Sequence, residues 1–141
     1  MARPLVKLDG LFEASLGVLL LAGAAAGWLG SADFPRPVGT ALIVVVGCAL
    51  MLVGAVLWRS GPTPRLLRVL AAANLLTALA AAAWLTAAGG FSTAGSTLVA
   101  VTAVVLAGLG VAQFPAARRL DSLPVQELVD SAERLNAPAG R

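Results

Sequence analysis

Histidine and tyrosine are absent from this sequence, and cysteine occurs once, as Cys48. Without histidine the chain lacks the usual proton shuttle, the commonest transition-metal ligand and the common axial ligand of haem. A single cysteine excludes an intramolecular disulfide. A serine such as Ser15 has no histidine to act as its base, and no glycine-rich phosphate-binding loop is present. We therefore expect no catalytic residues, no metal site and no cofactor, and predict that the protein is not an enzyme.

Charged residues are also scarce. They make up 12% of the 141 residues, whereas 59% are hydrophobic and the mean hydropathy is +0.90. A soluble domain of this size cannot bury so much apolar surface, so we expect a lipid bilayer as its partner. The pI near 10.5 does not indicate a nucleic-acid partner, because the basic residues flank apolar runs instead of lining one face of a soluble fold.

The apolar residues form four runs of about 20 residues. A helix of that length spans roughly 30 Å, which matches the hydrocarbon core of a bilayer. The runs are joined by short links rich in turn residues, and short links make consecutive helices antiparallel neighbours. We predict an all-α fold, a transmembrane antiparallel four-helix bundle over residues 1–114, with spans at about 10–30, 38–58, 66–88 and 96–114.

Lysine and arginine flank the four runs unequally. The links after the first and third runs hold only Arg36, whereas the other side holds Arg3, Lys7, Arg59, Arg65, Arg68, Arg118 and Arg119. Cytoplasmic loops of membrane proteins carry the excess of basic residues. We therefore predict a multi-pass protein of the inner (cell) membrane with both termini in the cytoplasm.

The first run has a second interpretation as a cleaved signal peptide. Arg3 and Lys7 would form its basic n-region, and residues 30–32 its small-residue cleavage site. The acidic Asp9 and Glu13 suit such a region poorly, and the run is long enough to span a membrane. The retained span is therefore the favoured interpretation.

The C-terminal tail, residues 115–141, differs from the rest in composition. Apolar residues recur at helical spacing over about 123–135, which predicts a short amphipathic cytoplasmic helix. Its polar face is net acidic, so it favours docking on a protein partner over binding to anionic lipid. The alternative is that so short a segment only frays in water.

Asp9 and Glu13 lie one helical turn apart at the start of the first run, and are the main candidates for chemistry inside the membrane. A buried carboxylate needs a partner. We predict that Glu13 pairs with Arg68, and that Asn74 and Gln113, at similar depth on other helices, extend a polar cluster with these residues. Such a cluster is either a structural ion pair that orients helices or a site for a proton or substrate.

Glycines in the apolar runs predict close helix packing. Gly23 and Gly27 form a GxxxG motif in the first run, and Gly47 and Gly54 lie seven residues apart in the second. These positions favour contacts inside the bundle, and a homodimer interface is the alternative.

Two resemblances bear on function. The segments LDGLFEASLG, RVLAAANLL and LGVAQF, within residues 7–115, resemble small four-span membrane proteins of GC-rich bacteria, which implies the fold. The four spans, Glu13 in the first of them and FPRPVGT at 34–40 are similar to small multidrug resistance transporters, which implies an essential membrane carboxylate at Glu13. The chain differs from that family in its longer tail and in placing Glu13 nearer the interface.

Two functional hypotheses remain open on the sequence. The first is a small accessory or scaffold subunit of a membrane complex, which docks a protein partner through its tail. The second is a small proton-coupled transporter or channel that uses Glu13 as its membrane-embedded carboxylate.

Overall fold

The computed structural model describes residues 2–29, 33–35 and 38–122. It contains four helices, α1 (Ala2–Ala26), α2 (Thr40–Arg59), α3 (Pro64–Ala87) and α4 (Thr93–Asp121), and the described residues include no strand. The all-α prediction and the number of helices are confirmed. The tail helix predicted at 123–135 lies outside the described residues.

The helices end where local chemistry stops them. α1 ends just before Gly27, whose φ of 74° is a left-handed conformation that glycine adopts without a steric penalty. The side chain of Thr63 accepts a hydrogen bond from the backbone N–H of Leu66 and caps α3, and Pro64 occupies the first position of that helix.

Two helices extend beyond the apolar runs that predicted them. α1 begins at Ala2, well before the expected start near residue 10, and α4 continues through Pro115 to Asp121, past the expected end at 114. Hydropathy indicates how much of a helix suits lipid, but polar and charged residues extend a helix equally well into water. The helices are therefore longer than the apolar runs at these two ends, and the span boundaries stay a prediction.

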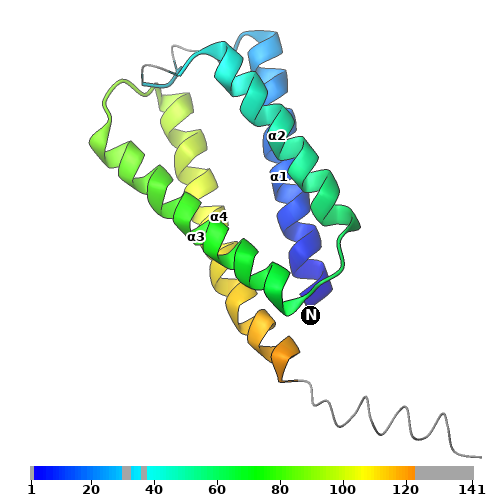
Figure 1. Ribbon diagram of the computed structural model, residues 1–141. Helices are drawn as coiled ribbons and strands as arrows, with labels where there is room; N and C mark the ends of the chain where they lie inside the picture. Colours follow the sequence, from blue (N-terminus) through cyan, green and yellow to red (C-terminus); the bar gives the residue numbers. More distant parts are fainter. Residues whose placement is uncertain (1, 30–32, 36–37, 123–141) are drawn as a thin grey trace, which may run out of the picture.

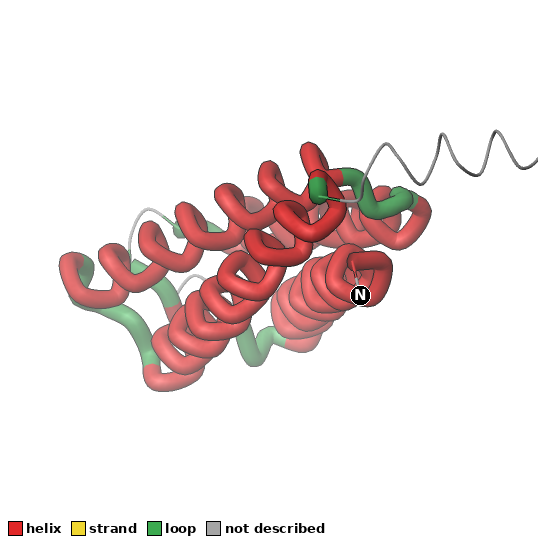
Figure 2. The backbone as a smooth tube through the Cα atoms, turned by 90° about the horizontal axis from the view of Figure 1, so that it is seen from below, coloured by secondary structure: helices red, strands yellow, loops and turns green. Residues whose placement is uncertain are grey.

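The helices pair as two antiparallel hairpins (Figure 1). α1 packs along α2, and α3 packs along α4, whereas the main contact between the hairpins is a smaller one between α1 and α4. Seen along the bundle from below, the two pairs lie side by side (Figure 2). The hairpins approach each other at the end where α1 and α3 begin and α2 and α4 end. We call this the basic end, because all the basic side chains of the described residues lie towards it.

Glycines bring α1 and α2 into backbone contact. A Cβ added at Gly17 would lie 2.6 Å from the carbonyl oxygen of Gly47, and one added at Gly54 would lie 2.5 Å from that of Gly10. Gly47 and Gly54 thus pack α2 against α1. Gly23 packs instead against Leu29 and Trp28, beyond its own helix, and the GxxxG interpretation of Gly27 is wrong because that residue ends α1 and has open space around it.

The outer surface of the bundle is apolar. Among the described residues, α2, α3 and α4 are long and apolar enough to cross a membrane. Their large hydrophobic side chains are widely exposed, including Leu52, Leu76, Leu79, Val104 and Val111 at 65–72%. Such a surface is stable against lipid tails and not against water.

Two apolar cores hold the hairpins together. The core at the basic end contains Val6, Leu57, Leu67, Ala116 and Ala117. The core at the opposite end contains Leu20, Leu29, Phe34, Ile43 and Val99. Between them lie a layer of buried polar side chains and a cavity, which form the candidate site.

Candidate functional site

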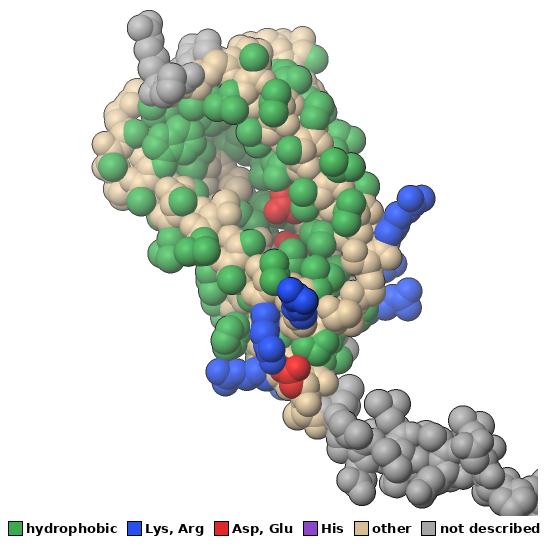
Figure 3. All heavy atoms as spheres, viewed as in Figure 1, with side chains coloured by type: hydrophobic (Ala, Val, Ile, Leu, Met, Phe, Trp, Pro, Cys, Tyr) green, Lys and Arg blue, Asp and Glu red, His purple; other side chains and the backbone are tan. Residues whose placement is uncertain are grey.

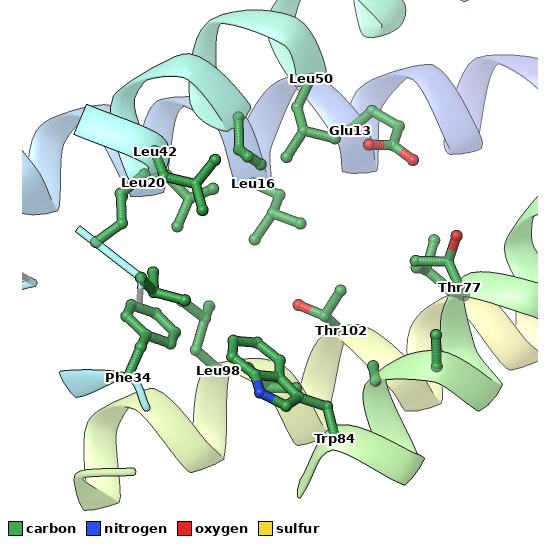
Figure 4. Close-up of a pocket in the computed structure, with 17 residues that line it drawn as sticks. Glu13, Leu16, Leu20, Phe34, Leu42, Leu50, Thr77, Trp84, Leu98 and Thr102 are labelled. Atoms are coloured by element: carbon green, nitrogen blue, oxygen red, sulfur yellow. The ribbon is translucent and has the colours of Figure 1, made fainter. Parts of the chain in front are cut away.

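A cavity of about 600 Å³ separates the two hairpins. Its lining comes from all four helices and is almost wholly apolar, with Leu16 and Leu20 from α1 facing Leu98 and Trp84 across the space (Figure 4). The space-filling view shows it as a hollow between the hairpins, with acidic side chains visible in its lower part (Figure 3). Cavities of about this volume accommodate drug-sized organic molecules.

Glu13 supplies the charge in this cavity. It projects from α1 beside Leu16, and the other described residues that line the cavity are uncharged. Thr77 and Thr102 add two hydroxyl groups from the opposite hairpin. Among the described residues, the Glu13 carboxylate has no hydrogen-bond or ion-pair partner. An unpaired charge in apolar surroundings is costly, so this group favours either a proton or a cationic ligand.

Asp9 lies one helical turn nearer the basic end, about 6 Å along α1 from Glu13. It is 1% exposed, although it is ionisable, and its two oxygens are shared between two amide donors. Asn74 on α3 donates to Oδ1 at 3.1 Å, and Gln113 on α4 donates to Oδ2 at 2.9 Å. Asn74 also donates to Gln113 Oε1 at 3.1 Å, which closes the ring of three side chains.

This ring, which we call the inner clasp (Asp9, Asn74 and Gln113), joins three helices between the cavity and the basic end. All three side chains are at most 5% exposed. Each of the described buried polar side-chain atoms has a hydrogen-bond partner, so the clasp is a satisfied network. It ties the first hairpin to the second just above the core at the basic end.

The predicted pairing of Glu13 with Arg68 is not what the structure contains. Arg68 forms an ion pair with Asp121, at the end of α4, and both side chains lie on the surface. Similar depth on two helices does not place two side chains on facing sides. Of the five residues predicted to cluster, the structure therefore joins Asp9, Asn74 and Gln113, places Glu13 in the cavity above them, and directs Arg68 outward.

The far end of the cavity is closed by aromatic rings that the sequence analysis did not single out. Phe34 stacks on Trp84 with ring centroids 6.2 Å apart, and Phe91 meets Trp84 edge-on at 4.8 Å. Phe34 reaches this position from the link between α1 and α2 of the first hairpin. The sequence signal for this contact was weak, because an aromatic residue in a loop indicates no particular partner.

The same link is attached to α4 by polar contacts, which we call the outer clasp (Asp33, Ser92 and Gly95). The Ser92 hydroxyl donates to the Asp33 carboxylate at 2.6 Å, and the Ser92 backbone N–H donates to the Asp33 carbonyl at 3.2 Å. Ser92 also accepts from the Gly95 N–H and so caps α4. Gly95 packs directly under the Asp33 carbonyl oxygen, where any side chain would overlap that oxygen.

Comparison of the sequence with models of protein families and with curated proteins, and of the fold with solved structures, finds no match. The class of protein therefore follows from the fold and the site alone. Three long apolar helices with lipid-suited outer faces define a small multi-span α-helical membrane protein.

Proposed function

We propose that this protein is a small proton-coupled transporter that binds a hydrophobic organic cation in the cavity between its hairpins. The observation that carries the proposal is the position of Glu13, a single carboxylate in the wall of an otherwise uncharged cavity. A lipophilic cation matches both features, because its apolar body suits the lining and its charge neutralises the carboxylate.

The exchange of ligand for proton balances charge at Glu13. With the cavity empty, the carboxyl group holds a proton and is neutral. A cation that enters displaces this proton, which leaves to water on the same side, and the pair of carboxylate and cation is again neutral. Either neutral state is cheaper in a membrane than the bare carboxylate, which costs roughly 2.5–3.5 kcal/mol near the centre of a helix on insertion scales. The coupling therefore follows from electrostatics at one residue.

In this proposal α1 is a fourth span and the basic end faces the cytoplasm. α1 is 25 residues long and packs along α2 through backbone contacts. At the basic end, Lys7 lies 4.5 Å from the ring centre of Trp58, and Arg118 lies 4.9 Å from that of Phe114. Pairs of a cation and an aromatic ring are typical of the membrane–water interface.

Binding of tetraphenylphosphonium to the full chain in detergent tests the proposal. We expect saturable binding to the wild type by calorimetry, with close to one proton released per cation in weakly buffered solution, and at least a tenfold loss of affinity in Glu13→Gln. The matched control is Asp121→Asn, which removes a carboxylate from the surface pair with Arg68 and leaves the cavity unchanged.

Flux into liposomes then separates transport from binding. A pH gradient should drive uptake of the cation by the wild type and by Asp121→Asn, and not by Glu13→Gln. Equal background uptake in all three proteins would remove the transporter proposal. The accessory-subunit hypothesis stays a prediction, because the tail on which it depends lies outside the described residues.

A further inference from the structure

At both ends of the cavity the two hairpins are joined by a small set of polar contacts beside one of the two apolar cores. The inner clasp lies on the side of the basic end, and the outer clasp lies at the opposite end, beside the rings of Phe34 and Trp84. Each hairpin is tightly packed within itself. Between α1 and α2 the backbones touch at glycines, and Gly110 of α4 packs with little free space against Leu75 and the Ala71 carbonyl oxygen of α3.

We infer that the inner and outer clasps are the two gates of the cavity, which open in alternation as the hairpins rock against each other. This inference rests on the proposed transport function and adds the residues that control access. Rigid bodies with a small shared interface move at that interface, and hydrogen bonds between side chains break at lower cost than a close-packed helix pair.

The inner clasp is suited to a gate because it is a polar layer between the cavity and the apolar core at the basic end, and this core has to part with it. Its three members come from α1, α3 and α4. Separation of the hairpins at this level therefore breaks both hydrogen bonds to Asp9 at the same time. The released carboxylate and amides are then hydrated by the water that enters from the basic end. Leucine in place of Asn74 would remove both hydrogen bonds that this side chain donates and leave Oδ1 of Asp9 buried without a donor, which disfavours the closed state.

The outer clasp is suited to a gate because one glycine controls its fit. The Asp33 carbonyl lies against Gly95 in the first turn of α4, and the neighbouring Phe34 covers Trp84. An alanine at position 95 would push Asp33 away and lift the Phe34 ring from the cavity. No charge is changed, and the Ser92 cap of α4 is kept.

Cysteine accessibility tests the gates without any ligand. The reporter is Thr102→Cys, a half-buried cavity residue, in a Cys48→Ser background because Cys48 is exposed. A membrane-impermeant maleimide is applied to vesicles of each orientation. We expect slow labelling from both sides in the otherwise unmodified chain, labelling at least tenfold faster from the outer side in Gly95→Ala, and at least tenfold faster from the cytoplasmic side in Asn74→Leu.

Two variants keep this test decisive. Gly108→Ala is the control for Gly95→Ala, because a Cβ at position 108 meets open space, and it should leave both labelling rates unchanged. Asp9→Asn is a more conservative change in the inner clasp than Asn74→Leu, because it keeps the shape of the side chain. It should also make labelling from the cytoplasmic side faster. Acceleration from the same side by Gly95→Ala and Asn74→Leu, or from neither side, would overturn the gate assignment. If labelling is accelerated from the expected side in each variant but tetraphenylphosphonium does not bind, the proposed transport of organic cations is wrong and the gate assignment stands.

Discussion

Asp9 illustrates how a single buried carboxylate is accommodated inside an apolar bundle. Its two oxygens accept hydrogen bonds from Asn74 and Gln113, and the two amides are themselves joined. A buried acceptor that loses its donor costs about 1–3 kcal/mol, which is more than the net gain from forming a typical hydrogen bond. The three side chains therefore stabilise the fold as a unit.

A double-mutant cycle measures this unit. We expect Asn74→Leu and Gln113→Leu each to lower the free energy of unfolding by about 1–3 kcal/mol. The loss in the double variant should differ from the sum of the two single losses by at least about 0.5 kcal/mol. The measurement is reversible unfolding in mixed micelles, with helicity as the signal. Strict additivity would mean that the two amides act independently on Asp9.

The sequence placed these three side chains at one depth, because helix rise converts residue number into distance along the bundle. It did not give the direction of Arg68, since direction depends on the rotation of each helix about its axis. The partner of Arg68 was also hidden, because Asp121 lies beyond the expected end of the fourth span. Glu13 was a candidate from its charge, its spacing from Asp9 and a resemblance to a transporter family. The cavity around it arises from the separation of the two hairpins, which a hydropathy profile does not record.

At the scale of the helix, the α1–α2 pair is defined by four glycines. Gly10 and Gly17 on α1 are seven residues apart, as are Gly47 and Gly54 on α2, and the two sets meet in antiparallel order. The sequence contained this signal. The GxxxG at 23 and 27 was singled out in the first run beside Gly47 and Gly54, whereas the glycines that meet Gly47 and Gly54 are Gly17 and Gly10.

Replacing one glycine in this interface by alanine tests its tightness. We expect Gly54→Ala to lower the unfolding midpoint and to cost about 1–3 kcal/mol, because the added Cβ meets backbone and not a flexible side chain. Gly108→Ala should be neutral or stabilising, by up to about 1 kcal/mol, since alanine is the better helix former and the position is open. If the two variants were equally stable in thermal unfolding, the close backbone contact would be wrong.

At the scale of the whole molecule, the fold is two hairpins that face each other across a cavity. Sequence predicted the helices and their antiparallel order, because length, apolarity and short links are local properties. It predicted one bundle where the structure has two pairs, since the choice of neighbours depends on side-chain fit around each helix. The excess of lysine and arginine on one side of the apolar runs predicts that this side faces the cytoplasm. The basic side chains of the described residues lie towards one end of the bundle, so this orientation can be tested.

Reporter fusions at the two ends of the chain test this arrangement. Four crossings place both termini on the same side of the membrane. The basic residues at the basic end predict that this side is the cytoplasm. We expect a periplasmically active reporter to be inactive at residue 1 and at residue 141, and active when inserted between α3 and α4. Activity at one end only would show that α1 does not span the membrane.

The backbone contact between α1 and α2 has a consequence for biogenesis. α1 leaves the ribosome before α2 and carries Asp9 and Glu13, so we expect it to enter lipid poorly by itself, whereas α2 is the most apolar of the three candidate spans. We expect the translocon to hold α1 until α2 has emerged and to release the two as a preformed pair. On this route the glycines act during synthesis, because they let α1 pack against α2 and insert into the membrane together with it.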